Sequence, residues 1–271
     1  MKSLLIRTGT GIVFTGLVIT AVLVSEKLLF NVFLLFTGIA LYEYRTLLLS
    51  MRIRLSVFFY IAALAVYFII SYTELWVVIG EKRMLALLLT LLFTVFIIEL
   101  FRKQENPFTH IAYSLLGILW IALPFALVNR IPLFASDGKY ILLSLFIFIW
   151  MYDTFAYCIG SLIGKHRLMK RVSPLKSWEG ALGSAIVTIA LSFFAPVLFP
   201  DIPFSLWQWV CFALIVIVSG TAGDLVESLF KRQLSVKESG FILPGHGGIL
   251  DRFDSLLFVL PFIVLYLTFI L

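Results

Sequence analysis

The stretch "YILLSLFIFIWMYDTFAYCIGSLI", residues 140–163, decides the fold class of this chain. It contains a single charged side chain, that of Asp153, within an otherwise apolar run. About 20 consecutive apolar residues are enough for a helix to cross the hydrocarbon core of a bilayer. The run lacks the alternation of apolar and polar residues that is typical of a membrane β-strand, and a helix satisfies its own backbone polar groups in lipid. The stretch is therefore predicted to be a transmembrane helix.

Comparable apolar segments recur along the whole chain of 271 residues, of which 62% are hydrophobic and 13% charged. Soluble domains carry about 25% charged residues, roughly twice that share. The predicted fold is an all-α, polytopic integral membrane bundle of about nine transmembrane helices. We expect these at roughly 8–24, 28–49, 55–72, 84–101, 110–128, 140–163, 179–199, 205–223 and 254–271.

The distribution of positive charge predicts the orientation of this bundle. Of the 21 lysines and arginines, 16 fall in loops on one side of the nine-segment topology. Because cytoplasmic loops carry the excess of cations, the N-terminus and the polar loops 164–178 and 224–253 are predicted to face the cytoplasm, with the C-terminus on the opposite side. The net charge of +6 follows largely from this topology, so it indicates an anionic partner only weakly.

Two pairs of carboxylates gather in the second half of the chain. Asp224 and Glu227 are three residues apart in "GDLVESLFKR", as are Asp251 and Asp254 in "DRFDS". Carboxylates at this spacing share one face of a helix and repel each other unless a cation neutralises them. A solvated helix end paired with local lysines and arginines is one interpretation. Two pairs that flank a glycine loop favour a hard divalent cation such as Mg²⁺ instead.

The glycine loop between these pairs reads "LPGHGGIL", residues 243–250. Gly247 and Gly248 permit a tight turn that brings backbone N–H groups close to an anion, just before the N-terminus of a predicted helix. The spacing differs from that of a Walker A loop. For His246 the alternatives stay open: it binds metal, donates to a phosphate, assists a leaving group, or bonds to a backbone carbonyl.

A second polar loop, "GKHRLMKRVSPLKSWEG" at residues 164–180, is rich in the cations that bind phosphates. Ser173 and Pro174 predict a turn, and Ser177 predicts the N-cap of a helix with Glu179 in its first turn. Cations at a membrane surface often reflect topology alone. Lys176, between the turn and the helix, is the strongest candidate for contact with a substrate.

Three carboxylates, those of Glu43, Glu99 and Asp153, lie within or near apolar segments, where a charge is costly. Glu43 and Glu99 each stand close to an arginine in sequence, which predicts local ion pairs. Asp153 has no cation nearby in sequence, so it is the functional candidate among the three.

The sequence "SLFKRQLSVKESGFILPGHGGILDRFD", residues 228–254, resembles the signature of the phosphatidate cytidylyltransferase (CDP-diacylglycerol synthase) family. That signature reads S-x-x-K-R, four residues, K-D, then P-x-H-G-G-x-x-D-R-x-D. "GDLVES", "VSPLKSWEG" and "DTFAYCIG" are similar to further motifs of the family. The one departure is Glu238, where the family has aspartate. The matching stretches span residues 153–254, and the first half of the chain matches only as a generic multi-helix membrane portion.

The resemblance implies transfer of CMP from CTP to phosphatidic acid, which yields CDP-diacylglycerol and pyrophosphate with one or two divalent cations, Mg²⁺ in the first place. It also implies a multi-pass protein of the cell (inner) membrane, with N-terminal transmembrane helices in residues 1–139 and a catalytic transmembrane portion in residues 140–271. The expected partners are the two substrates and the lipid bilayer, not nucleic acid, and a homodimer is compatible with such a bundle.

The residues and the resemblance together predict three overlapping sets of site residues. The catalytic set is Asp224, Lys231, His246, Asp251, Arg252 and Asp254, and the metal ligands are Asp224, Glu227, Asp251 and Asp254. The substrate-binding set is Asp153, Ser173, Lys176, Arg232, Lys237, Gly247 and Gly248.

Two alternatives remain. Another Mg²⁺-dependent membrane enzyme that acts on a phosphorylated lipid, such as a phosphoglycosyl transferase or a CTP-dependent polyprenol kinase, would want the same carboxylates. A secondary transporter is less favoured, because such folds often show repeated halves with sites at the bilayer midplane, whereas the chain has no convincing repeat and its acidic pairs lie at segment ends.

Overall fold

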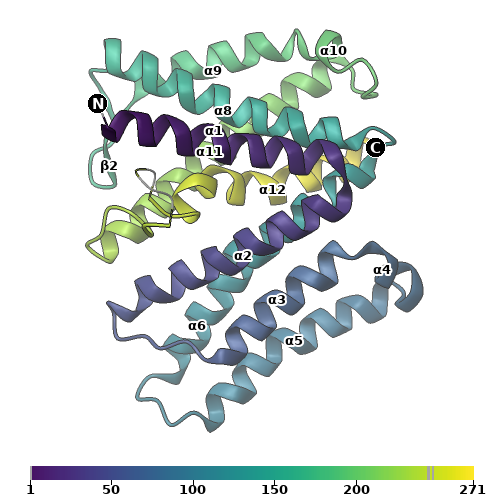
Figure 1. Ribbon diagram of the computed structural model, residues 1–271, viewed down its shortest axis with the longest axis vertical. Coiled ribbons are helices and arrows are strands. Elements are labelled where there is room, and N and C mark those ends of the chain that lie inside the picture. The colour runs from purple at the N-terminus through teal and green to yellow at the C-terminus, as the bar shows by residue number, and fades with distance from the viewer. Residues whose placement is uncertain (1, 243–244, 246) are drawn as a thin grey trace. The chain divides into compact units, whose positions relative to one another are not determined.

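The computed structural model describes residues 2–242, 245 and 247–271 of the chain (Figure 1). These residues are mainly helical, and the chain forms two compact units. The first unit contains residues 1–130 together with 238–252, and the second contains 131–237 together with 253–271. The loop that precedes the last helix therefore belongs with the N-terminal helices, not with the segment immediately before it.

Within its described residues, the first unit contains seven α-helices and one π-helical turn. In chain order these are α1 (Lys2–Val24), α2 (Glu26–Leu49), α3 (Val57–Ser71), α4 (Thr73–Ile79), α5 (Glu81–Phe101), α6 (Pro107–Gly117), the π-helical turn η1 (Ile118–Ala122) and α7 (Leu123–Val128).

Close packing in this unit depends on one glycine. A Cβ atom on Gly117 would lie 2.7 Å from the ring of Tyr44 on α2 and 2.9 Å from that of Phe59 on α3. The ring of Tyr44 is fully buried, and its hydroxyl donates to the carbonyl of Tyr113 at 2.9 Å. Aromatic rings therefore fill the space beside the α6 backbone, and α2, α3 and α6 share one core.

The second unit contains the remaining helices and a small hairpin. Its elements are the 3-10 helix η2 (Ile131–Phe134), α8 (Gly138–Ile163), β1 (Arg167–Met169), β2 (Ser173–Ser177), α9 (Trp178–Ser192), α10 (Ala195–Leu198), α11 (Leu206–Gln233) and α12 (Leu250–Ile270), the last of which begins in the first unit.

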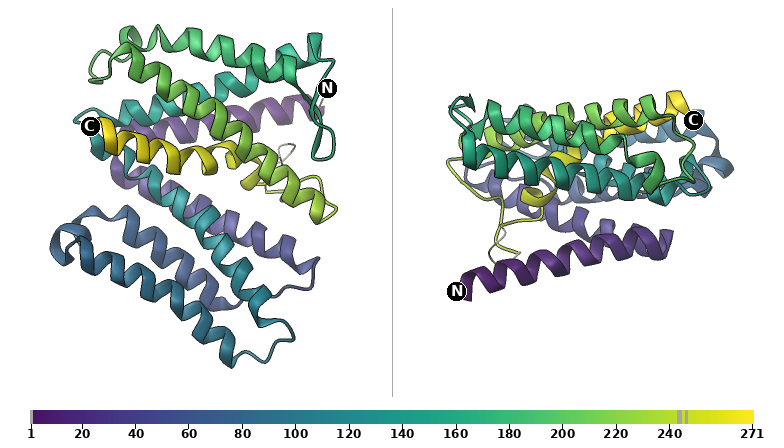
Figure 2. Two further views of the ribbon diagram at one scale, coloured as in Figure 1. Left: turned by 180° about the vertical axis from the view of Figure 1, so that it is seen from behind. Right: turned by 90° about the horizontal axis from the view of Figure 1, so that it is seen from above.

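Helices α8 and α9 of the second unit run side by side (Figures 1 and 2). A Cβ on Gly180 would lie 2.7 Å from the carbonyl oxygen of Ala156 and 3.0 Å from the Cα of Gly160. Small residues at such a crossing let two membrane helices approach closely. At the opposite end of the unit, Trp209 is fully buried and packs against Phe148 and Phe212.

Each of the nine apolar segments coincides with helix in the structure, which confirms the all-α membrane class. The exact count of nine is not confirmed. Among the described residues, six helices are long and apolar enough to cross a membrane, namely α2, α5, the continuous Pro107–Val128 helix, α8, α11 and α12. Helices α3 and α4 make a pair bent by 80°, and two further apolar helices, Thr8–Val24 and α9, are shorter. The predicted division of the chain into N-terminal helices (1–139) and a catalytic portion (140–271) stays a prediction.

The hairpin of the second unit differs from the predicted turn at Ser173 and Pro174. Ser173 begins β2, which pairs antiparallel with β1, and the turn lies at residues 170–172 instead. The predicted cap is confirmed, because the Ser177 hydroxyl accepts from the Gly180 N–H at 3.2 Å. Glu179, in the first turn of α9, accepts from the backbone N–H groups of Lys165 and His166, each at 3.1 Å. The beginning of the polar loop 164–178, at Lys165 and His166, is thereby bonded to the first turn of α9, where the loop also ends.

Candidate active site

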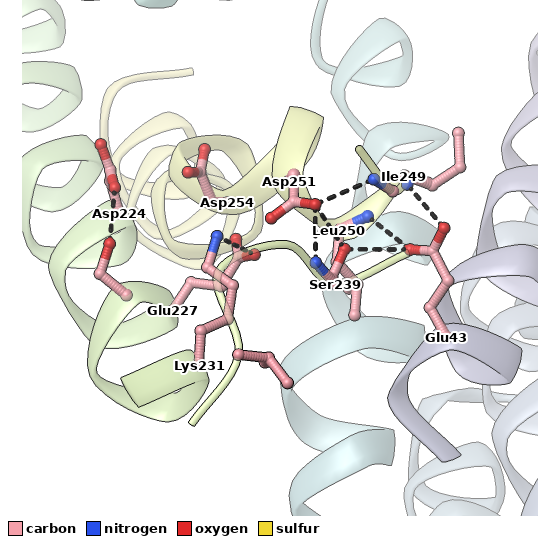
Figure 3. A network of polar contacts seen from close by, with 12 residues as sticks. Glu43, Asp224, Glu227, Lys231, Ser239, Ile249, Leu250, Asp251 and Asp254 are labelled. Atoms are coloured by element: carbon pink, nitrogen blue, oxygen red, sulfur yellow. Dashed lines mark hydrogen bonds and ion pairs between the residues drawn. The ribbon is translucent and has the colours of Figure 1, made fainter. Parts of the chain in front are cut away.

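Helices α11 and α12 lie close together where the second unit carries its carboxylates. A Cβ on Gly223 of α11 would lie 2.7 Å from the carbonyl oxygen of Asp254 and 2.7 Å from the Cβ of Phe258. The missing side chain lets the two backbones nearly touch at this point. Because Asp224 follows Gly223 directly, the close approach brings its carboxylate near that of Asp254 (Figure 3).

Three carboxylates from three helices gather in this part of the second unit. Asp224 of α11 and Asp153 of α8 both act electrostatically on Asp254 of α12. Asp224 and Asp254 are half-buried, and Asp153 is exposed. Like charges at short range repel strongly where water is partly excluded. The arrangement is therefore suited to a cationic partner.

Two lysines of the second unit place positive charge next to carboxylates of this part of the chain. Lys176 of β2 forms an ion pair with Asp224, whose other carboxylate oxygen accepts from the Ser228 hydroxyl at 3.3 Å. Lys231 pairs with Glu227 one turn earlier on α11, with Nζ and Oε1 3.0 Å apart. Glu227 is only 2% exposed, so its charge is tolerated because a lysine accompanies it.

The hairpin loop is held against α11 by more than one contact. Besides the Lys176–Asp224 pair, the Arg232 guanidinium donates through Nε to the carbonyl of Val172 at 3.3 Å. Its Nη1 donates to the carbonyl of Val236 at 3.4 Å. The polar loop 164–178 and the polar end of α11 thus lie together, as the topology predicted, and Arg232 is engaged with backbone carbonyls in this structure.

In the first unit the segment after residue 237 folds around a residue from the N-terminal half. The carboxylate of Glu43, on α2, accepts from the backbone N–H of Ile249 at 2.9 Å and from that of Leu250 at 3.0 Å (Figure 3). It also accepts from the Ser239 hydroxyl at 3.3 Å. The predicted local ion pair between Glu43 and Arg45 is wrong, because Glu43 points to this loop and the Arg45 guanidinium stacks over the Tyr60 ring. The corresponding prediction for Glu99 and Arg102 is confirmed.

Asp251 is part of the same polar network. Its Oδ2 accepts from the backbone N–H groups of Ser239 at 2.8 Å and Gly248 at 2.9 Å, and lies 2.9 Å from the Ser239 hydroxyl. Asp251 and Asp254 both lie on α12, one turn apart, although Asp251 belongs to the first unit and Asp254 to the second. Arg252, between them, is exposed.

The glycine loop is in contact with a carboxylate of the protein itself, that of Asp251. Gly247 has φ of +82°, a conformation that favours glycine, and a Cβ there would lie 2.6 Å from Asp251 Oδ2. The Gly248 N–H donates to Asp251. In this structure the N–H of Gly248 is therefore bonded to a residue of α12. A role of this loop in phosphate binding stays a prediction.

The other predicted site residues are placed as follows. Ser173 lies half-buried in β2, Lys237 is exposed just after α11, and His246 falls outside the described residues. The chemical roles assigned to all of these residues remain predictions.

The carboxylates have the donor chemistry for Mg²⁺, which prefers hard oxygen ligands. Among the residues that the structure describes, no three His, Cys, Asp or Glu side chains are grouped so that they could hold a metal ion by themselves. Mg²⁺ often takes only one or two carboxylates and completes its shell with water and substrate phosphates. Asp224 and Asp254 fit a cation shared in that way with a phosphorylated substrate.

Two residues of this network are not among the site residues predicted from the sequence. The sequence marks Glu43 as a costly carboxylate but predicts the wrong partner for it, and Ser239 gives no signal of its own. Only the burial cost of Glu43 could have pointed to a specific role, because its partners lie 196 to 207 residues further along the chain.

Comparison with known proteins places these motifs in context. The model of the cytidylyltransferase family matches residues 5–270. The phosphatidate cytidylyltransferase of Staphylococcus saprophyticus is 41% identical over 159 residues, 59% of this chain and 60% of that protein. The corresponding proteins of Staphylococcus haemolyticus and Staphylococcus aureus are 42% identical over 163 residues and 39% identical over 178 residues. These matches cover 59% and 64% of this chain, and 60% and 65% of the two relatives, which is less than two thirds of their length.

Proposed function

We propose, since the chain belongs to the cytidylyltransferase family, that it transfers CMP from CTP to phosphatidic acid and releases pyrophosphate. The family resemblance seen in residues 153–254 is confirmed by the match over residues 5–270. The relatives named phosphatidate cytidylyltransferase support phosphatidic acid as the acceptor. The product would be CDP-diacylglycerol.

The observation that carries this proposal is the meeting of Asp224 and Asp254 beside Lys176 in a unit made of membrane helices. A lipid acceptor requires a membrane body, and a triphosphate donor requires charge compensation at a polar surface. Both requirements are met within one compact unit of the chain.

The reaction needs positioning more than acid–base chemistry. A phosphate oxygen of phosphatidic acid is already anionic, so it can attack the α-phosphorus of CTP without a strong base. The new P–O bond forms as the bond between the α- and β-phosphates breaks, and pyrophosphate leaves with that electron pair. Lys176, Lys231 and Arg252 would neutralise phosphate oxygens, which is how enzymes of this type lower the barrier.

A divalent cation would supply further charge neutralisation where phosphate oxygens and protein carboxylates meet. Asp224 and Asp254 would hold it, and the assignment of Asp251 and Glu227 as further ligands stays a prediction from the sequence. In the structure Glu227 is paired with Lys231, so it supports the site through that lysine unless the pair opens. Asp153 would face the same carboxylates from α8.

The orientation proposed for the membrane follows from the distribution of charge in the sequence. The cation excess predicts a cytoplasmic site, which suits a donor dissolved in the cytoplasm, and a protein of the cell membrane with its C-terminus on the opposite side. A homodimer stays a prediction.

An acceptor panel tests the proposal. Purified protein in lipid nanodiscs is given Mg²⁺, CTP labelled in the α-phosphate or, in a parallel reaction, in the γ-phosphate, and either phosphatidic acid, diacylglycerol or a polyprenol. We expect α-label in the lipid phase only with phosphatidic acid, and none when Asp224→Asn replaces the wild type in a parallel preparation. A polyprenol as the preferred acceptor, or no transfer to phosphatidic acid, would overturn the proposed function.

A further inference from the structure

We propose that Glu43 is a positioning residue for the nucleotidyl transfer: from α2, it fixes the start of α12 and thereby the presentation of Asp251. This inference rests on the proposed function, because it assigns Glu43 to the helix that carries the site carboxylates. Glu43 lies outside the signature stretch 153–254 and comes from the half of the chain that the motifs left without a role.

The first observation is how Glu43 meets the helix end. Helix α12 begins at Leu250, and the first N–H groups of any helix lack partners within the helix. A side chain just before the helix usually accepts from them. Here the two carboxylate oxygens of Glu43 accept from Ile249 and Leu250 at 2.9 and 3.0 Å. The cap of α12 therefore comes from a residue 206 positions earlier.

The second observation is that the same carboxylate reaches Asp251 through one serine. The Ser239 hydroxyl lies 3.3 Å from Glu43 Oε2 and 2.9 Å from Asp251 Oδ2. The Ser239 N–H also donates to Asp251, at 2.8 Å. The segment leading to α12 is thus fastened at Ser239 and again at residues 248–250, with Glu43 and Asp251 as the two acceptors (Figure 3).

The third observation is the close fit of the chain around Glu43. A Cβ on Gly240 would lie 2.6 Å from Glu43 Oε1, and one on Gly248 would lie 2.5 Å from Oε2. Glu43 itself is 2% exposed. A buried carboxylate is costly unless hydrogen bonds satisfy it, and charge-assisted bonds of this kind are the strong ones. Gly240 and Gly248 therefore leave just enough room for the Glu43 carboxylate, and a larger residue at either position would displace it.

The consequence for the reaction is positional. Asp251 follows Leu250 directly, so the bond from the Leu250 N–H to Glu43 limits how the first turn of α12 can rotate or fray. Misplacement of a reacting or binding group by about 1 Å can cost on the order of 100-fold in rate. Glu43 also occupies the amide groups of Ile249 and Leu250, so the cations of the loops, and not these amides, would meet the substrate phosphates.

The test compares two pairs of variants in nanodiscs. Glu43→Gln keeps one acceptor oxygen but turns an amide N–H₂ toward a backbone donor or Ser239. Its control is Glu99→Gln, at an equally buried carboxylate that pairs with Arg102. Gly240→Ala pushes on the Glu43 carboxylate without changing any charge, and its control is Gly38→Ala on α2, where a Cβ meets nothing within 4 Å.

Two readouts are measured for each protein: amide hydrogen exchange in residues 239–250, and kcat and KM for CTP per folded enzyme. We expect Glu43→Gln and Gly240→Ala to speed exchange in this stretch and to lower kcat about 10-fold, the loss of roughly one charge-assisted hydrogen bond. The melting temperature and KM should change little, and the controls should match wild type in exchange and kcat.

Unchanged exchange at residues 239–250 in Glu43→Gln would overturn the proposal that Glu43 fixes the start of α12. Faster exchange with wild-type kcat would overturn the proposal that Glu43 matters for catalysis. Should Glu43→Gln fail to fold, Gly240→Ala decides both points. A wild-type protein that transfers no CMP would contradict the proposed function instead, and the exchange measurement still reports separately whether Glu43 holds the loop.

Discussion

Gly223 of α11 lies against the backbone carbonyl of Asp254 on α12, so close that a Cβ would come within 2.7 Å of that oxygen. Three residues earlier, Gly220 faces the same helix with ordinary spacing, since its Cβ would lie 3.5 Å from Val259. The two glycines are one turn apart and differ only in the room beside them.

Gly223→Ala should therefore separate the two helices at the carboxylates, because a backbone oxygen cannot move aside as a flexible side chain can. We expect a loss of about 1–3 kcal/mol in stability, as for other overpacked sites, and at least a 10-fold loss of kcat. Thermal unfolding in detergent and turnover of CTP measure the two effects. Gly220→Ala is the matched control and should stay within about 2-fold of wild type. Equal behaviour of the two variants would contradict the role of the close approach.

The ion pair between Lys176 and Asp224 connects the hairpin to α11. Lys176→Met should lower kcat/KM for CTP about 10-fold or more, because it removes a positive charge from a cluster of carboxylates. In a double-mutant cycle of thermal stability with Asp224→Asn, the two losses of stability should not add, since the residues are in contact. Lys170→Met, in the exposed turn of the same hairpin, controls for general loss of loop charge. Additive losses would show that the pair does not act as a unit.

Asp251→Asn should abolish turnover while the protein remains folded in the membrane. Asparagine retains one oxygen for the N–H groups of Ser239 and Gly248, so the loop keeps most of its bonds, but the negative charge is lost. Turnover and thermal unfolding are compared with those of Asp201→Asn, an exposed aspartate before α11. Activity retained by Asp251→Asn would remove this residue from the catalytic set.

Removal of divalent cations should stop the reaction reversibly. EDTA is expected to abolish turnover, and added Mg²⁺ to restore it, if phosphate oxygens and carboxylates share a cation. Asp254→Asn should raise the Mg²⁺ concentration needed for half-maximal rate about 10-fold or more, because it removes one oxygen donor with its charge. A reaction indifferent to EDTA would contradict the metal proposal and leave the lysines as the source of neutralisation.

The helices could be predicted from sequence because they depend on local information, and the meeting of Asp224 with Asp254 could be predicted because the family signature contains both carboxylates. Apolar runs of sufficient length fix where helices form, and Ser177 fixes where α9 begins. The signature places both aspartates at helix ends beside polar loops. Gly223, beside Asp224, is a further local signal of close helix packing.

Glu43 could not be assigned from sequence because its role depends on which helices pack together. An arginine two residues away suggested a local pair, yet the amide groups of Ile249 and Leu250 lie far along the chain and gave no pattern to match. The hairpin at 167–177 was missed for a different reason: Ser173-Pro174 favours a turn locally, but pairing with residues 167–169 extends it. The count of membrane spans also depends on lengths and bends that apolar composition alone does not set.

The proposed reaction moves the α-phosphate of CTP, with its nucleoside, onto a lipid phosphate. The most direct measurement places label separately in the α- and γ-phosphates of CTP and follows each one with phosphatidic acid and Mg²⁺. We expect α-label in the lipid product and γ-label in pyrophosphate. Recovery of γ-label in the lipid would instead reveal a kinase and would contradict the proposed reaction.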